Sequence, residues 1–204
     1  GAGKSTSFKM MCGLAKPTGG TAKIMGIDIL ENPSKARSNL GYMAQKFSLY
    51  GNLTLRQNLE FFASVYGINF LNKDKRVDEI IDIFNFHDIQ DMKSQDLPLG
   101  FKQRLSLACA VIHNPPILFL DEPTSGVDVI ARREFWNHIT SLAKLGVTIL
   151  VTTHFMDEAE YCNRISLFYK GETIALGTPY ELKTKANADN MEQAFVNLIK
   201  ESGK

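Results

Sequence analysis

The chain has 204 residues, enough for one large domain on the usual allowance of ~100–200 residues. With 23 basic and 22 acidic side chains its formal net charge is +1, which gives no indication of a polyanion-binding surface. Its three cysteines are widely spaced and form no C-x-x-C pair, which argues against a disulfide framework or a zinc knuckle. No stretch approaches the ~18 apolar residues of a membrane span, and no leader resembles a secretory signal. We therefore expect a soluble, intracellular protein, which can still work at a membrane.

The chain opens on GAGKST, and residues 3–6 match the end of a phosphate-binding loop, G-x-x-x-x-G-K-[ST]. In such a loop the backbone N–H groups form a nest for phosphate, and the following helix adds its positive end. Lys4 would reach the β- and γ-phosphates, and the Ser5 hydroxyl would ligate magnesium. The first glycine of the pattern falls before residue 1, so GAGKST by itself is equally a flexible terminus rich in small residues.

The pattern of apolar residues alternates between helix and strand along the chain, and the middle third is mostly helical. A helix is expected directly after the loop, and residues 16–29 carry turn glycines and an alternating run that predicts a hairpin or an edge strand. Thr54 fits the N-cap of a helix that stops at Gly67. A second amphipathic helix covers residues 75–86, with its apolar face at Val77, Ile80, Ile81 and Phe84.

Two later segments are apolar runs that end in polar side chains. PILFLDEP reaches Asp121 and Glu122, and GVTILVTTH ends in His154. Runs that are apolar on both faces favour central strands of a parallel sheet, and residues 131–145 supply a helix of crossover length between them. Residues 164–179 predict a hairpin that turns at Lys170-Gly171.

Carboxylates at the end of a buried strand lie where α/β sheets bind ligands. Asp121 is expected to hold Mg²⁺ through a water, and Glu122 to orient or deprotonate the attacking water. The alternative is a strand that meets solvent at an acidic turn. It is disfavoured because a second strand also ends in a polar group, His154. The remaining histidines are interpreted as structural: His87, His113 and His138.

Taken in order, these motifs resemble the ATP-binding cassette of ABC transporters. GAGKST is similar to the end of the Walker A loop, and ILFLDEP resembles Walker B with its catalytic glutamate. Gln45 falls where the family's Q-loop glutamine lies, Asp128 in TSGVD is at the acidic position of the D-loop, and His154 matches the switch histidine. The resemblance implies an α/β P-loop NTPase core with a mainly parallel sheet, an inserted α-helical subdomain, and ATP and Mg²⁺ as ligands.

The resemblance also implies a division of the chain and a set of site residues. Residues 1–204 would be a single nucleotide-binding domain, with its core at 1–51 and 111–204 and its helical subdomain at 52–110. The nucleotide-binding residues would be Gly1, Ala2, Gly3, Lys4, Ser5 and Thr6. The catalytic residues would be Glu122, His154 and Gln45, and the metal ligands Ser5, Gln45 and Asp121. The family's adenine-stacking aromatic residue, its first Walker A glycine and the strand before the loop would precede residue 1. We therefore expect this exact chain to bind ATP poorly and to hydrolyse little, since phosphoryl transfer depends on fixed donors.

One motif departs from the family pattern. The signature LSGGQ, which caps the ATP of the opposite subunit, is altered here to Leu97-Pro98-Leu99-Gly100-Phe101. Proline has neither hydroxyl nor N–H, so two donors are lost, at ~1.5–3 kcal/mol for each hydrogen bond to a charged group. Proline is tolerated in a first helical turn, so the helix dipole and the Gly100 amide can survive. The alternative is that LPLGF starts a helix and serves no nucleotide.

The partners follow from the same resemblance. Each composite site joins the Walker motifs of one cassette to the signature of another, so a second cassette is expected in a homodimer, a heterodimer or one polypeptide. An intact Glu122 beside an altered signature favours an unlike pair.

Residues 43–68 and GTPYELK resemble bacterial drug-resistance exporters, which implies an integral membrane permease and a peripheral place on the cytoplasmic face of the inner membrane. No nucleic acid is expected. The alternatives are a cassette that acts on ribosomes or nucleic acid, and a regulatory cassette without turnover.

Overall fold

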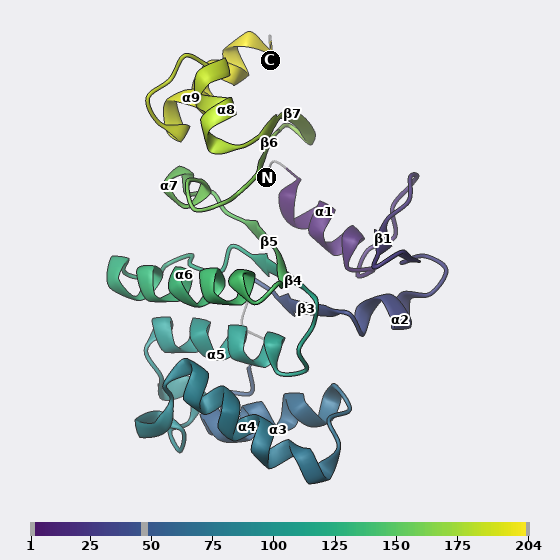
Figure 1. Ribbon diagram of the computed structural model, residues 1–204, viewed down its shortest axis with the longest axis vertical. Helices are drawn as coiled ribbons and strands as arrows, with labels where there is room; N and C mark the ends of the chain where they lie inside the picture. Colours follow the sequence, from purple (N-terminus) through teal and green to yellow (C-terminus); the bar gives the residue numbers. More distant parts are fainter. Residues whose placement is uncertain (1–2, 46–48, 203–204) are drawn as a thin grey trace. The chain divides into compact units, whose positions relative to one another are not determined.

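The computed structural model describes residues 3–45 and 49–202 (Figure 1). The chain divides into two compact units, one made of Gly1–Met10 with Thr152–Lys204 and the other of Met11–Val151. In chain order the helices and strands are α1 (Lys4–Met11), β1 (Lys23–Ile24), β2 (Ile27–Asp28), α2 (Pro33–Arg37), β3 (Leu40–Met43), α3 (Leu55–Val65), α4 (Phe70–Phe84), α5 (Leu99–Val111), β4 (Ile117–Asp121), α6 (Val129–Lys144), β5 (Thr148–Thr152), α7 (Met156–Ala159), β6 (Ile165–Tyr169), β7 (Glu172–Gly177), α8 (Pro179–Lys185) and α9 (Met191–Glu201). Two short 3-10 segments, His87–Ile89 and Ser94–Asp96, lie between α4 and α5.

A sheet of order β3-β4-β5 contains both predicted apolar runs. β3 and β4 pair in parallel, from Leu40 opposite Ile117 to Met43 opposite Leu120. β4 is central and almost wholly buried, as predicted. The same prediction is wrong for β5, which lies at the edge of the described sheet and is only partly buried. An apolar run predicts that a segment is buried, but it does not predict how many strands flank that segment in the sheet.

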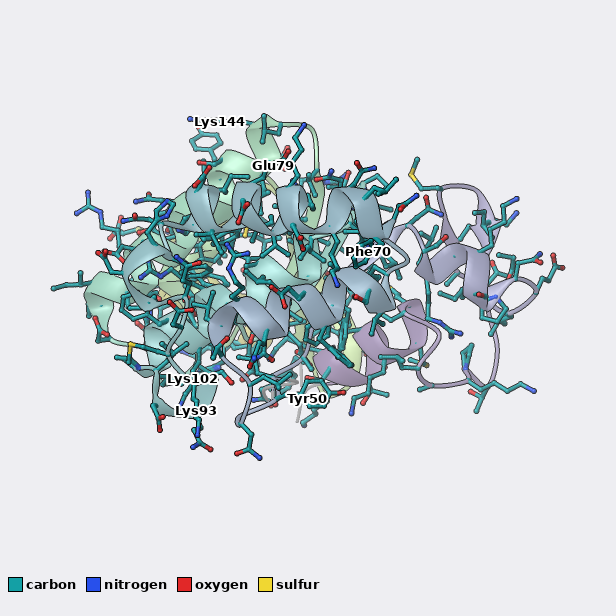
Figure 2. The ribbon with its side chains drawn as sticks, turned by 90° about the horizontal axis from the view of Figure 1, so that it is seen from below. Tyr50, Phe70, Glu79, Lys93, Lys102 and Lys144 are labelled. Atoms are coloured by element: carbon teal, nitrogen blue, oxygen red, sulfur yellow. The ribbon has the colours of Figure 1, made fainter. Side chains whose placement is uncertain are left out.

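The antiparallel pair of β1 and β2 confirms the hairpin predicted at residues 16–29. The N-cap prediction at Thr54 is confirmed as well, because its hydroxyl accepts from the Gln57 amide and the Gln57 side chain accepts from the Thr54 amide, a capping box. The predicted apolar face of α4 is buried at all four positions. Figure 1 shows α5 between α6 on one side and α3 and α4 on the other, and Figure 2 looks onto α3 and α4 lying side by side.

A buried amide fixes the loop that leads into α3. Asn58 is 0% exposed. Its Oδ1 accepts from the Tyr50 amide at 2.9 Å, and its Nδ2 donates to the carbonyls of Tyr50, Leu53 and Thr54 at 3.1, 3.3 and 2.9 Å. A buried polar group is stable only when its hydrogen bonds are made, so Asn58 holds residues 50–54 in one conformation.

The unit containing the C-terminus is built on the hairpin of β6 and β7. Lys170 and Gly171 both have positive φ, at 47° and 85°, as a tight hairpin turn requires, and the predicted turn is confirmed. Helices α7, α8 and α9 share one apolar cluster with this hairpin. The cluster consists of Ala159, Ile165, Leu167, Ala175, Leu182, Ala186, Met191, Ala194 and Leu198. None of the helices in the described residues is long and apolar enough to cross a membrane.

Candidate functional site

The opening motif starts a helix. Lys4, Ser5 and Thr6 form the first turn of α1, and Gly3 precedes it with φ +93°, a conformation that L side chains rarely adopt. The Gly3 carbonyl accepts from the Ser7 amide at 3.0 Å and from the Ser7 hydroxyl at 3.1 Å. The first amides of a helix have no partner within it, so this end can receive phosphate. The predicted Gly1 and Ala2 lie outside the described residues.

The acidic end of β4 brings together two predicted residues that are far apart in the sequence. The Gln45 side-chain amide donates to Glu122 Oε2 at 2.9 Å across 77 positions. Asp121, the last residue of β4, is 3% exposed, and Glu122 follows it with φ +46°. A glutamate in the left-handed region is uncommon, and such residues cluster at functional sites. Asp121, Glu122 and Gln45 thus lie at one strand end within one unit.

The buried carboxylate of Asp121 makes its surroundings electronegative. Burial raises the pKa of the Cys12 thiol to about 12, and the charge of Asp121 raises it as well. The same two causes raise the pKa of Tyr42 to about 12. Both groups therefore stay neutral at physiological pH and leave the negative charge of Asp121 at this strand end. A place with this potential suits a cation.

The donor types fit magnesium. Mg²⁺ prefers oxygen ligands and usually takes one or two protein carboxylates together with substrate phosphates. Within one unit, Asp121 offers a carboxylate and Gln45 an amide oxygen. Over the residues that the structure describes, no group of three or more histidine, cysteine, aspartate and glutamate side chains could hold a metal by itself. These few protein ligands are consistent with a Mg²⁺ site in which the phosphates of a nucleotide supply further oxygen ligands.

The altered signature begins a helix, and its residues pack on the segment before and within α6. Pro98 is the N-cap of α5, with no side-chain capping bond, and Leu97 is buried. A Cβ added at Gly100 would lie 2.7 Å from the Cβ of Ala131, so only glycine lets α5 come this close to α6. Leu99 lies beside Gly126, since a Cβ there would be 3.4 Å from Leu99 Cδ2.

Phe101, which stands where the family has glutamine, also has a structural partner. Its ring lies under the Arg104 guanidinium, with 4.2 Å from the ring centroid to Cζ, and Arg104 forms an ion pair with Glu134 of α6 at 3.4 Å. Lys102 donates from Nζ to the Gln95 carbonyl at 2.6 Å and thereby ties the first turn of α5 to the preceding 3-10 segment. The packing of Phe101 accounts for an aromatic ring at this position.

Asp128 has a local role that the sequence reasoning missed. It is the N-cap of α6, and its Oδ1 accepts from the amides of Ile130 and Ala131 at 3.0 Å each. The available signal was an aspartate directly before a helical segment.

His154 lies on an exposed turn between β5 and α7, with its ring centroid 4.1 Å from that of Phe155. The sequence reasoning also missed Glu158, which is fully buried four residues further on and accepts a hydrogen bond from Thr153. The spacing H-x-x-x-E across the start of a helix was the only signal for it. His154 and residues 3–6 belong to one unit, whereas Gln45, Asp121 and Glu122 belong to the other.

Comparisons with known proteins agree with these motifs. A family model described as ABC transporter matches residues 1–125. The probable multidrug ABC transporter ATP-binding protein YbhF of Escherichia coli K12 is 57% identical over 98% of this chain and 35% of its own length. A solved ATP-binding subunit of an ABC transporter has a TM-score of 0.84 at 27% identity, covering 97% of this chain and 84% of that one. A dimeric, post-hydrolysis structure of the ATP-binding cassette MJ0796 bound to ADP and Pi has a TM-score of 0.77 at 27% identity, covering 87% and 81%. The chain thus spans about a third of the length of its E. coli relative.

Proposed function

The chain belongs to the ABC transporter family, and we propose that it binds and hydrolyses ATP with Mg²⁺ as the nucleotide-binding component of an exporter of drug-like or other hydrophobic compounds. The observation that carries the proposal is the contact between Gln45 and Glu122 beside the buried Asp121. Glu122 as the proposed base, Gln45 as the proposed orienter of water and Asp121 as the proposed metal ligand share one strand end, which supports the proposal. The high identity to a protein named as a multidrug transporter component supports export.

In the proposed site the Lys4 ammonium and the first amides of α1 bind the phosphates. Ser5, Gln45 and Asp121 would hold Mg²⁺, which when bound neutralises phosphate charge. Glu122 accepts the proton of the attacking water, and the amide of Gln45, already within hydrogen-bonding distance of this carboxylate, orients the water. The imidazole of His154 donates a hydrogen bond to the transferred phosphoryl group.

We further infer that the helical subdomain, residues 52–110, and the core, residues 1–51 and 111–204, are the functional parts of this cassette. The packing of α3, α4 and α5 on one another supports the subdomain. A permease in the inner membrane would contact the segment after Gln45, which leaves the cassette peripheral on the cytoplasmic face.

The altered signature determines which second cassette we propose. A dimeric cassette is known among the solved relatives, and the E. coli relative is about three times as long as the stretch it shares with this chain. We propose an unlike partner with a complete signature, in the same polypeptide or in a second one. The site formed by this chain's Lys4, Asp121 and Glu122 would then turn over, and the site capped by LPLGF would be the weaker one.

The test is MgATP hydrolysis by the full-length protein with its partner, compared with Glu122→Gln. Loss of the general base should lower turnover by about 10²–10⁴-fold and leave ATP binding intact. The exposed Glu31→Gln is the matched control and should hydrolyse ATP like the wild type. Turnover that is the same in Glu122→Gln would sink the proposal. Clear Glu122-dependent turnover by the purified protein without a second, unlike cassette would show that LPLGF can complete a site and would contradict the unlike pair.

A further inference from the structure

Glu158 is a buried carboxylate that the proposed reaction does not use. It lies in α7 and is 0% exposed. Removing a carboxylate from water is costly unless strong hydrogen bonds replace the water. Such a buried group needs a hydrogen-bond donor close by, and one lies five residues before it in the sequence, directly before His154.

The partner is Thr153, whose hydroxyl forms two hydrogen bonds in a chain. Thr153 Oγ1 donates to Glu158 Oε2 at 2.5 Å, and it accepts from the backbone amide of Phe155 at 3.0 Å. Because a hydroxyl has a single hydrogen, its donation to the carboxylate leaves its lone pairs for the amide. The Thr153 side chain thus closes a turn whose middle residue is His154.

The turn of residues 153–155 also places the Phe155 ring against the His154 imidazole. The rings of His154 and Phe155 have centroids 4.1 Å apart and an angle of 36° between their planes. The amide held by Thr153 is that of Phe155, so the same hydrogen bond sets the backbone on both sides of His154. All of these residues lie in the unit that contains Thr152–Lys204 (Figure 1).

We propose that Thr153 and Glu158 form a positioning pair that holds the His154 imidazole in the orientation needed for phosphoryl transfer. The proposal rests on the proposed ATPase function. Glu158 touches no substrate. Its carboxylate orients the Thr153 hydroxyl, this hydroxyl holds the Phe155 amide, and the resulting turn of residues 153–155 sets the direction of the His154 ring. A donor on an otherwise exposed side chain is effective only when its direction is fixed in advance.

The test uses the full-length protein with its partner and compares Thr153→Val with Thr153→Ser. Valine keeps the shape of threonine and removes both hydrogen bonds, whereas serine keeps them. We expect Thr153→Val to lower kcat by about 10–100-fold, the range of a small misplacement of a catalytic group, with the KM for ATP and the affinity for ADP unchanged. Thr153→Ser should retain most of the turnover. Thr173→Val, the same change at an exposed position of β7, is the matched control and should hydrolyse ATP like the wild type.

A double-mutant cycle separates positioning from plain stability. If Thr153 acts through His154, Thr153→Val should cause no further loss in a His154→Ala background. Equal losses in both backgrounds, or wild-type kcat in Thr153→Val, would overturn the proposal. Should Thr153→Val fail to bind ADP because it does not fold, Glu158→Met replaces it and is expected to show the same loss of kcat and the same cycle. Absence of Glu122-dependent turnover in the wild type would instead remove the proposed function, so the two failures are distinct.

Discussion

At the scale of single residues, several side chains near the proposed site also shape the backbone. Glu122 is held in the left-handed region, which costs of order 1–3 kcal/mol and persists only where the surroundings impose it. The bond from Gln45 is one of those restraints. Asp128, which the family resemblance predicts to lie in the D-loop, caps α6.

The capping role of Asp128 predicts a measurable loss of stability. Asp128→Ala removes the acceptor for the amides of Ile130 and Ala131, and a lost N-cap costs about 0.5–2 kcal/mol. Thermal unfolding should shift down by about 2–4 °C for each kcal/mol in a protein of this size. Asp128→Asn keeps an oxygen acceptor and should unfold near the wild-type temperature. An unchanged melting temperature in Asp128→Ala would contradict the cap.

At the scale of elements, the contact between β3 and α5 decides how the helical segment joins the sheet. A Cβ at Gly41 of β3 would lie 2.2 Å from the Ala110 carbonyl oxygen and 2.7 Å from Leu118 Cδ1. The φ of Gly41 is not positive, so this glycine is required by packing and not by its dihedral angles. The close approach sets the distance between the strand that leads to Gln45 and the helix that begins with the signature.

Gly41→Ala should therefore destabilise the fold. The added methyl group meets a backbone oxygen that cannot change rotamer, and overpacking of this kind costs about 1–3 kcal/mol or more. Gly19→Ala is the matched control, because no described atom lies within 4 Å of a Cβ built there and its φ is not positive. Chemical denaturation should show a lower midpoint for Gly41→Ala only. Equal midpoints for both variants would mean that α5 moves away from β3 without cost.

At the scale of the whole molecule, two half-buried histidines link stability to pH. Burial lowers the pKa of His113, and the charge of Arg76 lowers it too, against the hydrogen bond to the Leu40 carbonyl, which raises it. Burial and the charge of Arg104 lower the pKa of His138, whereas Glu134 raises it. His113 stacks on Tyr66 and His138 on Phe84, so both rings are part of the packing.

The sign of the pH dependence follows from these shifts. The unfolded chain takes up protons on both rings as the pH falls through their ordinary pKa of about 6.5, while the folded protein does not until a lower pH. The free energy of unfolding is therefore unaffected well above 6.5 and falls as the pH drops below it. Urea denaturation between pH 7.5 and 5 measures this slope. His113→Gln and His138→Gln should each flatten this slope; a slope that survives both replacements would contradict the assignment.

The sequence alone determined several features that depend on local periodicity and local chemistry. The cap at Thr54, the buried face of α4, the apolar run of β4 and the turn at Lys170-Gly171 can all be predicted because each is set by residues within a few positions of one another. The family could be predicted from the sequence for a related reason, because its motifs are short and lie in a fixed order along the chain.

Only the tertiary structure decided the contacts that join distant parts of the chain. The edge position of β5, the bond between Gln45 and Glu122, the approach of Gly41 to Ala110 and the packing of Phe101 under Arg104 depend on which surfaces meet when the chain is compact. The burial of Glu158 likewise cannot be predicted from periodicity, because a carboxylate is stable in a core only where hydrogen-bond donors such as the Thr153 hydroxyl lie next to it. Local patterns specify the elements, and the surfaces on which those elements pack specify the site.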